Sequence, residues 1–182
     1  MAPVPPTSPY PAGALPLTLV LGGARSGKSR YAEGMITALP PPWIYLATAQ
    51  AHDAEMAERI AAHRARRGTG WHTIEEPHDI ASVLADNRGT VLIDCLTLWL
   101  SNRMLAGADM DAEFDALEVS LDVCLSPKVL VSNEVGFGIV PDNVLARRFR
   151  DLQGRLNQRL AARADRVVLV VAGLPIAVKE PK

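Results

Sequence analysis

The chain has 182 residues, a length that suits one domain with a buried core. Hydrophobic residues make up 48% of it and charged residues 21%, a balance typical of globular proteins and not of disordered ones. The formal net charge is −1, so the basic excess expected of a protein that binds nucleic acid or an anionic membrane is absent. No apolar run reaches the ~18 residues that a membrane-spanning helix needs.

The first 16 residues, MAPVPPTSPYPAGALP, contain neither the basic segment nor the uninterrupted apolar segment of a secretory signal. Their prolines predict an extended tail outside the fold, which leaves 17–182 as a single catalytic domain. Cys95 and Cys124 form no disulfide framework and lack metal-ligand spacing, so we expect both to be small buried residues. A reducing cytoplasm is the expected location.

Beyond residue 16, apolar runs alternate with longer helical patterns. The expected elements are a strand at 17–23, a helix at 28–39, a strand at 40–49, a helix at 53–67, a strand at 90–95, helices at 96–104 and 110–124, a strand at 128–136 running into a loop, a helix from Pro141 to about Ala164, and, within 166–179, a strand, a Gly-Leu-Pro turn and a short last strand. Apolar strands between helices predict an α/β fold with a mostly parallel sheet, helices on both faces and a C-terminal hairpin strand.

A phosphate-binding loop follows the first strand. The stretch LGGARSGKS has the G-x-x-x-x-G-K-[ST] spacing after an apolar strand and at the start of a helix, which predicts a P-loop NTPase-like protein. Backbone N–H groups of such a loop surround phosphates, and the helix N-terminus adds partial positive charge. We expect Lys28 to reach the terminal phosphates and Ser29 to hold Mg²⁺. The predicted nucleoside triphosphate site comprises Gly22, Gly23, Ala24, Arg25, Ser26, Gly27, Lys28 and Ser29.

Acidic residues stand at two further strand ends. Asp94 closes TVLID in the manner of a Walker B strand, where a carboxylate binds Mg²⁺ directly or through water; a helix N-cap is the alternative. Asn133 and Glu134 stand where the next strand should end, at the edge where open α/β sheets bind ligands. Glu134 is therefore a candidate catalytic residue. The alternative for both is turn chemistry beside Gly136 and Gly138.

Six stretches form a more specific pattern when taken together. They are GGARSGKSRYAE (22–33), YLATAQ (45–50), EMAERIAAHRARR (55–67), GWHTIEEP (70–77), SNEVGFGIVP (132–141) and GRLNQRLA (154–161). This set resembles the bifunctional cobinamide kinase/cobinamide-phosphate guanylyltransferases of cobalamin biosynthesis, over roughly residues 17–179. The P-loop alone is not specific, whereas its combination with NEVG-x-GIVP and R-I-x-x-H is.

The resemblance implies two reactions. GTP or ATP first phosphorylates the aminopropanol hydroxyl of adenosylcobinamide. GTP then donates GMP to an enzyme histidine, and cobinamide phosphate accepts it to give adenosylcobinamide-GDP. The histidine of R-I-x-x-H is His63 here, and a homotrimer is also implied. Nucleotide contacts are expected in the YLATAQ stretch, at Thr48, Ala49 and Gln50, and one of Glu75 and Glu76 is expected to read the guanine edge. The alternative for these two acids is ordinary exposed residues.

His63 has two interpretations on the residues alone. A neutral imidazole is nucleophilic near pH 7 and forms a phosphoramidate, which divides a nucleotidyl transfer into two displacements. Nearby arginines are then available to neutralise phosphate charge. Alternatively, Met56, Ile60 and His63 follow i, i+4, i+7 spacing, so that His63 continues an apolar stripe and the arginines only satisfy the helix end. The arginines concerned are Arg64, Arg66 and Arg67.

If His63 is the nucleophile, the helix that carries it must bring it close to the bound nucleotide. A helix after the second strand starts at the ligand edge and runs away from it, and ten residues from Asp53 to His63 span ~15 Å. Helix 53–67 must therefore project from the sheet, swing inward with GTP, or serve a neighbouring subunit. We favour a mobile helix, with hinges at Gly68, Gly70 and the 48–52 loop. In that case Lys28 matters to both reactions and His63 only to the second.

Two other functions fit the P-loop. A small-molecule kinase without the transferase activity predicts that His63 can be lost without consequence. A regulatory nucleotide switch predicts slow hydrolysis gated by a protein partner and needs no corrinoid pocket.

Overall fold

The computed structural model of the chain describes residues 17–51, 53–87 and 89–181. The proline-rich stretch 1–16, predicted to form an extended tail, lies outside the described residues. Outside them too are five side chains of the second helix, those of Glu55, Met56, Arg59, His63 and Arg66. Within the described part of the chain, no helix is long and apolar enough to cross a membrane.

The described strands form one seven-stranded sheet. They are β1 (Leu17–Gly22), β2 (Trp43–Ala47), β3 (Trp71–Glu75), β4 (Thr90–Asp94), β5 (Lys128–Asn133), β6 (Arg166–Val171) and β7 (Leu174–Lys179). Their order across the sheet is β3-β2-β4-β5-β1-β6-β7. All neighbours pair in parallel except β6 and β7, which are antiparallel. The predicted mostly parallel sheet with a C-terminal hairpin is therefore confirmed.

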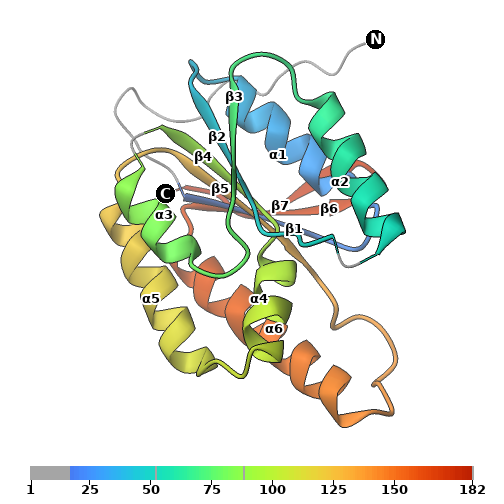
Figure 1. Cartoon of the computed structure of the whole chain (residues 1–182). Helices are drawn as coiled ribbons and strands as arrows, with labels where there is room; N and C mark the ends of the chain where they lie inside the picture. Colours follow the sequence, from blue (N-terminus) through green and yellow to red (C-terminus); the bar gives the residue numbers. More distant parts are fainter. Residues whose placement is uncertain (1–16, 52, 88, 182) are drawn as a thin grey trace.

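Helices cover both faces of this sheet, as predicted (Figure 1). The described helices are α1 (Lys28–Thr37), α2 (Ala54–Arg66), α3 (Ile80–Asp86), α4 (Leu96–Leu105), α5 (Met110–Val123) and α6 (Val144–Arg163). α3 to α6 pack on one face over a core that includes Trp99 and Phe114. α1 packs on the other face, where Ala32 and Ile36 meet the valines of β1, β5 and β6. Both buried cysteines are free thiols, as expected.

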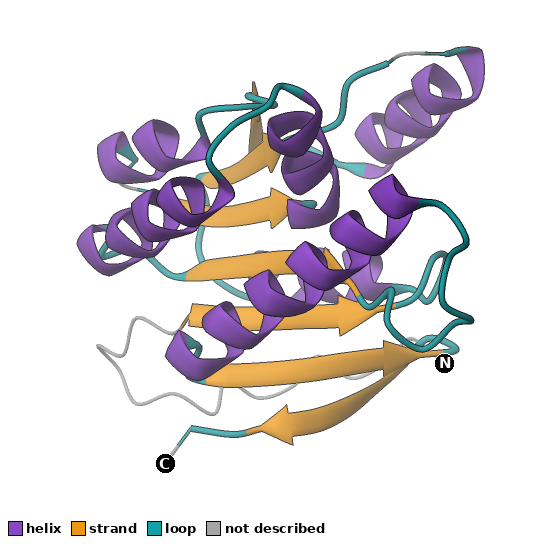
Figure 2. Ribbon diagram, turned by 90° about the horizontal axis from the view of Figure 1, so that it is seen from below, coloured by secondary structure: helices purple, strands orange, loops and turns teal. Residues whose placement is uncertain are grey.

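α2 departs from the usual packing of a crossover helix. Its described side chains are all exposed except that of Ile60, which is half-buried. Figure 2 shows α2 standing away from the sheet at the upper right of the view. Neither apolar core includes a described residue of α2. The helix that carries His63 therefore projects from the sheet, which is one of the three arrangements that the sequence geometry allowed.

Several predicted boundaries were wrong. β3 and α3 were not predicted at all, because WHTIE is a half-exposed edge strand without a clear apolar run. α6 begins three residues after Pro141, because Asn143 caps it by accepting a hydrogen bond of 2.7 Å from the Ala146 amide. The last turn is Ala172–Gly173 and not Gly-Leu-Pro; both residues have positive φ, and Pro175 belongs to the edge strand β7.

Parallel pairing brings four strand ends to the same edge of the sheet. Ala47 of β2 lies opposite Asp94 of β4, and Gly22 of β1 lies opposite Asn133 of β5. This carboxyl edge is where open α/β sheets bind ligands. The register therefore gathers the P-loop, the Walker B carboxylate and the end of β5 on one side of the molecule.

Candidate active site

The loop between β1 and α1 is tightly curled. It contains two residues with positive φ, Arg25 at 56° and Gly27 at 95°. Gly22 has no room for a side chain, because a Cβ atom would lie 2.5 Å from Ser26 Oγ and 2.7 Å from the Val170 carbonyl oxygen. A loop of this shape at a helix N-terminus presents backbone N–H groups to a phosphate.

Two side chains of the loop have the chemistry of phosphate ligands. Lys28 Nζ donates a hydrogen bond of 3.0 Å to the Gly23 carbonyl, so the ammonium group lies against the loop. Ser26 Oγ is buried and has no hydrogen-bond partner among the described residues. An unsatisfied buried hydroxyl costs free energy, and a phosphate oxygen would supply the missing partner.

The turn between β6 and β7 supports the loop from behind. The Gly173 amide donates a hydrogen bond of 2.8 Å to the Ser26 carbonyl. A Cβ atom on Gly27 would lie 3.3 Å from Gly173 Cα, so the two backbones are in close contact. Sequence reasoning missed this support, since only the strand order places residue 173 beside residue 26.

Asp94 lies at the end of β4, where a tyrosine hydroxyl orients its carboxylate. Its Oδ2 atom accepts a hydrogen bond of 3.0 Å from the Tyr45 hydroxyl, and the guanidinium of Arg67 lies 3.6 Å from the centroid of the Tyr45 ring. Burial, followed by the adjacent Asp94 carboxylate, raises the pKa of the Tyr45 phenol far above its ordinary value, which keeps the phenol a donor. The alternative interpretation of Asp94 as a helix N-cap is wrong, because Cys95 is the N-cap of α4 and has no side-chain cap.

Thr48 holds this region together. Its fully buried hydroxyl donates 2.7 Å to the Cys95 carbonyl and accepts 3.0 Å from the Cys95 amide. Asn102 of α4 adds a hydrogen bond of 2.9 Å to the Thr48 carbonyl. The Thr48 side chain thus fixes the segment after Asp94, while Ala49 and Gln50 follow it, half-buried, in the loop toward α2.

The residues at this edge fit a Mg²⁺ ion bound together with a nucleotide. Ser29 on the first turn of α1 offers a hydroxyl, and Asp94 offers a carboxylate oriented by Tyr45. No group of three or more His, Cys, Asp or Glu side chains that could hold a metal occurs among the described residues. Mg²⁺ does not require one, because it keeps several waters and takes its other ligands from phosphates.

Asn133 and Glu134 lie directly beside the P-loop. The Glu134 amide donates a hydrogen bond of 3.1 Å to the Gly22 carbonyl, which fixes the end of β5 against the loop. Glu134 Oε1 also accepts a hydrogen bond of 2.6 Å from the Gly136 amide. Glu134 therefore lies at the edge where such sheets bind ligands, and it also shapes the turn at Gly136.

A buried polar network behind β5 was not predicted. Gln153 Nε2 donates to Ser132 Oγ (2.9 Å) and to Asn157 Oδ1 (3.0 Å), and Asn157 Nδ2 donates to the Asn133 carbonyl (3.0 Å). The Asn133 amide donates 2.8 Å to Thr97 Oγ1. These bonds tie α6 and α4 to the end of β5. Polar residues on the buried face of the last long helix were the available signal.

The two acids of the EEP stretch have different partners. Glu75 is exposed and forms an ion pair with Arg64 of α2. Glu76 Oε1 accepts hydrogen bonds from the amides of His78 (2.8 Å) and Asp79 (2.9 Å), so it shapes the turn into α3. Of the pair, Glu75 is the more exposed and Glu76 is the one bonded to backbone amides; which of them reads guanine stays a prediction.

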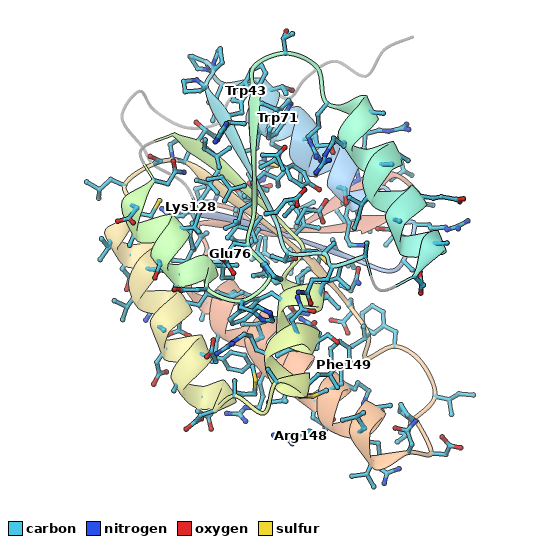
Figure 3. The ribbon with its side chains drawn as sticks, viewed as in Figure 1. Trp43, Trp71, Glu76, Lys128, Arg148 and Phe149 are labelled. Carbon is cyan, nitrogen blue, oxygen red and sulfur yellow. The ribbon has the colours of Figure 1, made fainter. Side chains whose placement is uncertain are left out.

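Aromatic side chains fix the segment that follows α2. The Trp43 and Trp71 rings lie 5.6 Å apart between centroids (Figure 3). Gly70 has φ of 101°, and a Cβ atom there would lie 2.8 Å from the Trp43 ring. A Cβ atom on Gly68 would meet nothing within 4 Å. Of the two glycines proposed as hinges, Gly70 is therefore held by Trp43 and Gly68 stands in open space.

The fold and the site define a P-loop nucleotide-binding protein of the α/β class. A comparison of solved structures matches the flagellar accessory protein FlaH of Methanocaldococcus jannaschii, with a TM-score of 0.51 over 93% of this chain and 82% of that one. The sequence identity is 12%, so this likeness concerns the fold alone.

The chain belongs to the cobinamide kinase / cobinamide phosphate guanyltransferase family, whose model matches residues 18–178. It is 48% identical over 166 residues to the bifunctional adenosylcobalamin biosynthesis protein CobP of Pseudomonas aeruginosa, covering 88% of this chain and 96% of that protein. It is also 42% identical to the bifunctional protein CobU of Salmonella typhimurium, over 90% of this chain and 99% of that one. The family predicted from the six sequence stretches is confirmed.

Proposed function

We propose that this chain phosphorylates the aminopropanol hydroxyl of adenosylcobinamide with GTP or ATP, and then transfers GMP from GTP to the phosphate so formed. Cobinamide kinase and cobinamide phosphate guanylyltransferase are the activities of its family. The observation that carries the proposal for this chain is a P-loop at the carboxyl edge with Glu134 fixed beside it by the 3.1 Å bond to Gly22.

In the kinase reaction, the substrate hydroxyl oxygen attacks the γ-phosphorus and the bond to the β-γ bridging oxygen breaks. Lys28 and the loop amides stabilise the charge on the terminal phosphates. We assign the hydroxyl proton to the carboxylate of Glu134, the residue that directly follows β5 and whose amide is bonded to the P-loop. Ser29 and Asp94 would hold Mg²⁺, which when bound would neutralise part of the phosphate charge.

In the guanylyltransferase reaction, an imidazole nitrogen of His63 attacks the α-phosphorus of GTP and pyrophosphate leaves. An oxygen of cobinamide phosphate then attacks the same phosphorus, the P–N bond breaks, and adenosylcobinamide-GDP is released. The P-loop that holds the β- and γ-phosphates in the first reaction holds the leaving pyrophosphate in the second. Lys28 therefore serves both reactions, and His63 serves only the second.

The position of α2 supports a movement of this helix during the second reaction. Its described side chains make little contact with the sheet, and the open surroundings of Gly68 allow a change of direction there. The ion pair of Arg64 with Glu75 and the stacking of Arg67 on Tyr45 tie the end of α2 to the site. We propose that GTP draws α2 toward the P-loop, that Arg64, Arg66 and Arg67 then face phosphate, and that Glu75 accepts hydrogen bonds from guanine.

Two further properties are proposed, of which only the oligomeric state follows the family resemblance. From the resemblance we propose a homotrimer. The cytoplasmic location is proposed on other grounds, namely the two free cysteines, Cys95 and Cys124, which a reducing compartment keeps as thiols. A mass measurement of the native protein in solution tests the first of these.

Transfer of label from [γ-³²P]GTP to adenosylcobinamide tests the kinase activity. We expect the full chain to label the corrinoid, Lys28→Ala to lose at least about 100-fold in rate, and the matched lysine variant Lys182→Ala to behave as the original chain. Slow hydrolysis of GTP that adenosylcobinamide does not change, with an unlabelled corrinoid, would instead identify a regulatory switch.

A further inference from the structure

The segment between β5 and α6, together with the first two residues of α6, exposes an unusual amount of apolar surface. Five large apolar side chains within nine residues stand in solvent, and we call them the β5–α6 patch. The exposed fractions are Phe137 84%, Ile139 98%, Val140 59%, Val144 73% and Leu145 53%. Clustered exposed apolar side chains of this kind mark a binding surface.

The patch is presented by a loop that is held at both ends. At its start, Glu134 accepts the hydrogen bond from Gly136. At its end, Arg147 donates to the carbonyl groups of Pro141 (2.9 Å) and Asp142 (2.6 Å), and Asn143 caps α6. Because these bonds already fix the backbone, little conformational entropy of the loop is lost when a ligand binds.

Along the chain, the patch begins next to the candidate active site. Its first residue, Phe137, follows Glu134 by three positions, and Glu134 is bonded to Gly22 of the P-loop. A P-loop holds the phosphates of the donor, so the acceptor of the γ-phosphoryl group must lie on the terminal-phosphate side of that loop. The loop that leaves β5 at Glu134 is therefore well placed to hold the body of the acceptor.

We propose that the β5–α6 patch is the surface on which the corrin ring of the acceptor docks, an inference that rests on the proposed function. A corrin is a broad macrocycle with apolar faces and a fringe of carboxamides. The run from Val135 to Pro141 contains no charged side chain, which suits contact with such a face. Aromatic and branched apolar side chains supply the contact area that a ring of this size needs.

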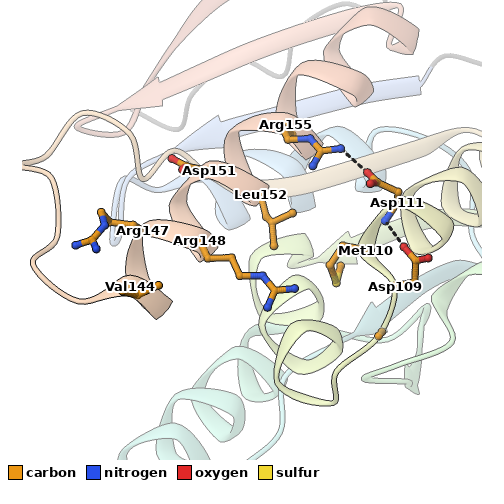
Figure 4. A pocket seen from close by; sticks show the side chains of 10 residues that line it. Asp109, Met110, Asp111, Val144, Arg147, Arg148, Asp151, Leu152 and Arg155 are labelled. Carbon is orange, nitrogen blue, oxygen red and sulfur yellow. Dashed lines mark hydrogen bonds and ion pairs between the residues drawn. The ribbon is translucent and has the colours of Figure 1, made fainter.

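A neighbouring cavity suits the carboxamide fringe. Val144 of the patch also lines a cavity of about 580 Å³ between the first half of α6 and the turn from α4 to α5 (Figure 4). Its polar lining includes Arg148, Asp109 and Asp151. Carboxamides both donate and accept hydrogen bonds, so they can pair with carboxylates and with guanidinium groups alike. The apolar patch and this polar cavity together match the two kinds of surface on a corrinoid.

The test replaces two side chains of the patch, in Phe137→Ala/Ile139→Ala, and measures three quantities on the full chain. They are the KM for adenosylcobinamide in the kinase reaction, the KM for GTP, and the yield of labelled protein from [α-³²P]GTP without corrinoid. The matched control is Val119→Ala/Val123→Ala, which removes exposed apolar side chains from the outer face of α5. Size-exclusion chromatography with light scattering reports the oligomeric state of each variant.

We expect the patch variant to raise the KM for adenosylcobinamide at least about tenfold, as removal of apolar contacts does in substrate pockets. Its KM for GTP, its labelling by GTP and its oligomeric state should match those of the control. An unchanged KM for adenosylcobinamide would overturn the inference. A changed oligomeric state would overturn it as well, because the patch would then be covered by a second copy of the chain. This outcome can be told apart from a failure of the proposed function. In that case the original chain itself would not phosphorylate adenosylcobinamide.

Discussion

The hydroxyl of Tyr45 on β2 donates a hydrogen bond of 3.0 Å to the Oδ2 atom of Asp94 at the end of β4. This bond crosses the β2–β4 pair and leaves the carboxylate with a fixed orientation at the carboxyl edge. Because Arg67 lies over the ring of the same tyrosine, Tyr45 also connects the end of α2 to the proposed Mg²⁺ site. Partners of this kind orient a metal ligand without touching the metal.

Loss of this hydroxyl should weaken the use of Mg²⁺. We expect Tyr45→Phe to raise the Mg²⁺ concentration that supports half-maximal kinase activity by about tenfold, the lower end of the effect of removing such a partner. The measurement is a Mg²⁺ titration at saturating GTP, with Tyr31→Phe on α1 as the matched control. An unchanged midpoint would mean that Asp94 is oriented without Tyr45 or does not serve the metal.

The P-loop glycines offer a comparison between two neighbouring positions. Gly22→Ala places a Cβ atom against Ser26 Oγ and the Val170 carbonyl, whereas Gly23→Ala meets nothing within 4 Å. We expect Gly22→Ala to lower the free energy of unfolding by about 1–3 kcal/mol, the cost of overpacking. For Gly23→Ala we expect a change below about 0.5 kcal/mol. Urea denaturation without nucleotide measures both; equal losses would contradict the close approach at Gly22.

Patterning predicted most of the sheet but failed at its edge. The buried strands β1, β4 and β5 are continuous apolar runs, so their sequences identify them. β3 has no fully buried residue and its burial does not alternate regularly along the strand, so the same criterion did not find it. α2 was predicted from its helical pattern. Its position away from the sheet depends on tertiary packing, which hydrophobic periodicity does not predict.

The candidate site was predictable where a motif fixes the backbone. The P-loop spacing located residues 22–29, and the strand ends located Asp94 and Glu134. Tyr45, Thr97 and Gly173 escaped prediction because each acts through a neighbour that only the strand order supplies. The buried hydroxyl of Thr48 is bonded to the backbone of Cys95, and its expected contact with the nucleotide stays a prediction.

A half-buried ion-pair cluster between α5 and α6 should make stability depend on pH. Glu118, 12% exposed, pairs with Arg159 and Arg163, and the hydrogen bond from Arg159 is the main cause that lowers the pKa of its carboxyl group. A lowered folded-state pKa means that the contribution is present above the unfolded value, about 4.3, and is lost as the pH falls through the folded value.

We therefore expect Glu118→Gln to cost about 1–2 kcal/mol of unfolding free energy near pH 7. The difference from the original chain should persist down to about pH 5 and shrink below about pH 4. Urea titrations across this range measure it, with Glu58→Gln on the exposed side of α2 as the control. A difference that grows as the pH falls would contradict the assigned sign.

Glu75 should distinguish guanine from adenine. If its carboxylate leaves Arg64 and accepts hydrogen bonds from the guanine edge, Glu75→Gln should raise the KM for GTP about tenfold in the guanylyltransferase reaction and leave that for ATP in the kinase reaction unchanged. Glu76→Gln is not a neutral comparison, because Glu76 shapes the turn into α3. Glu58→Gln on the exposed side of α2 is the suitable control.

The central claim is that His63 carries GMP between GTP and the corrinoid. The direct measurement is intact mass of the full chain after incubation with Mg²⁺ and [α-³²P]GTP, followed by treatment with acid and with alkali. The account predicts one GMP for each chain, labile in acid, stable in alkali, absent in His63→Ala and present in His72→Ala, a control on β3. An original chain that carries no GMP but still phosphorylates adenosylcobinamide, or an adduct that survives in His63→Ala, would contradict it.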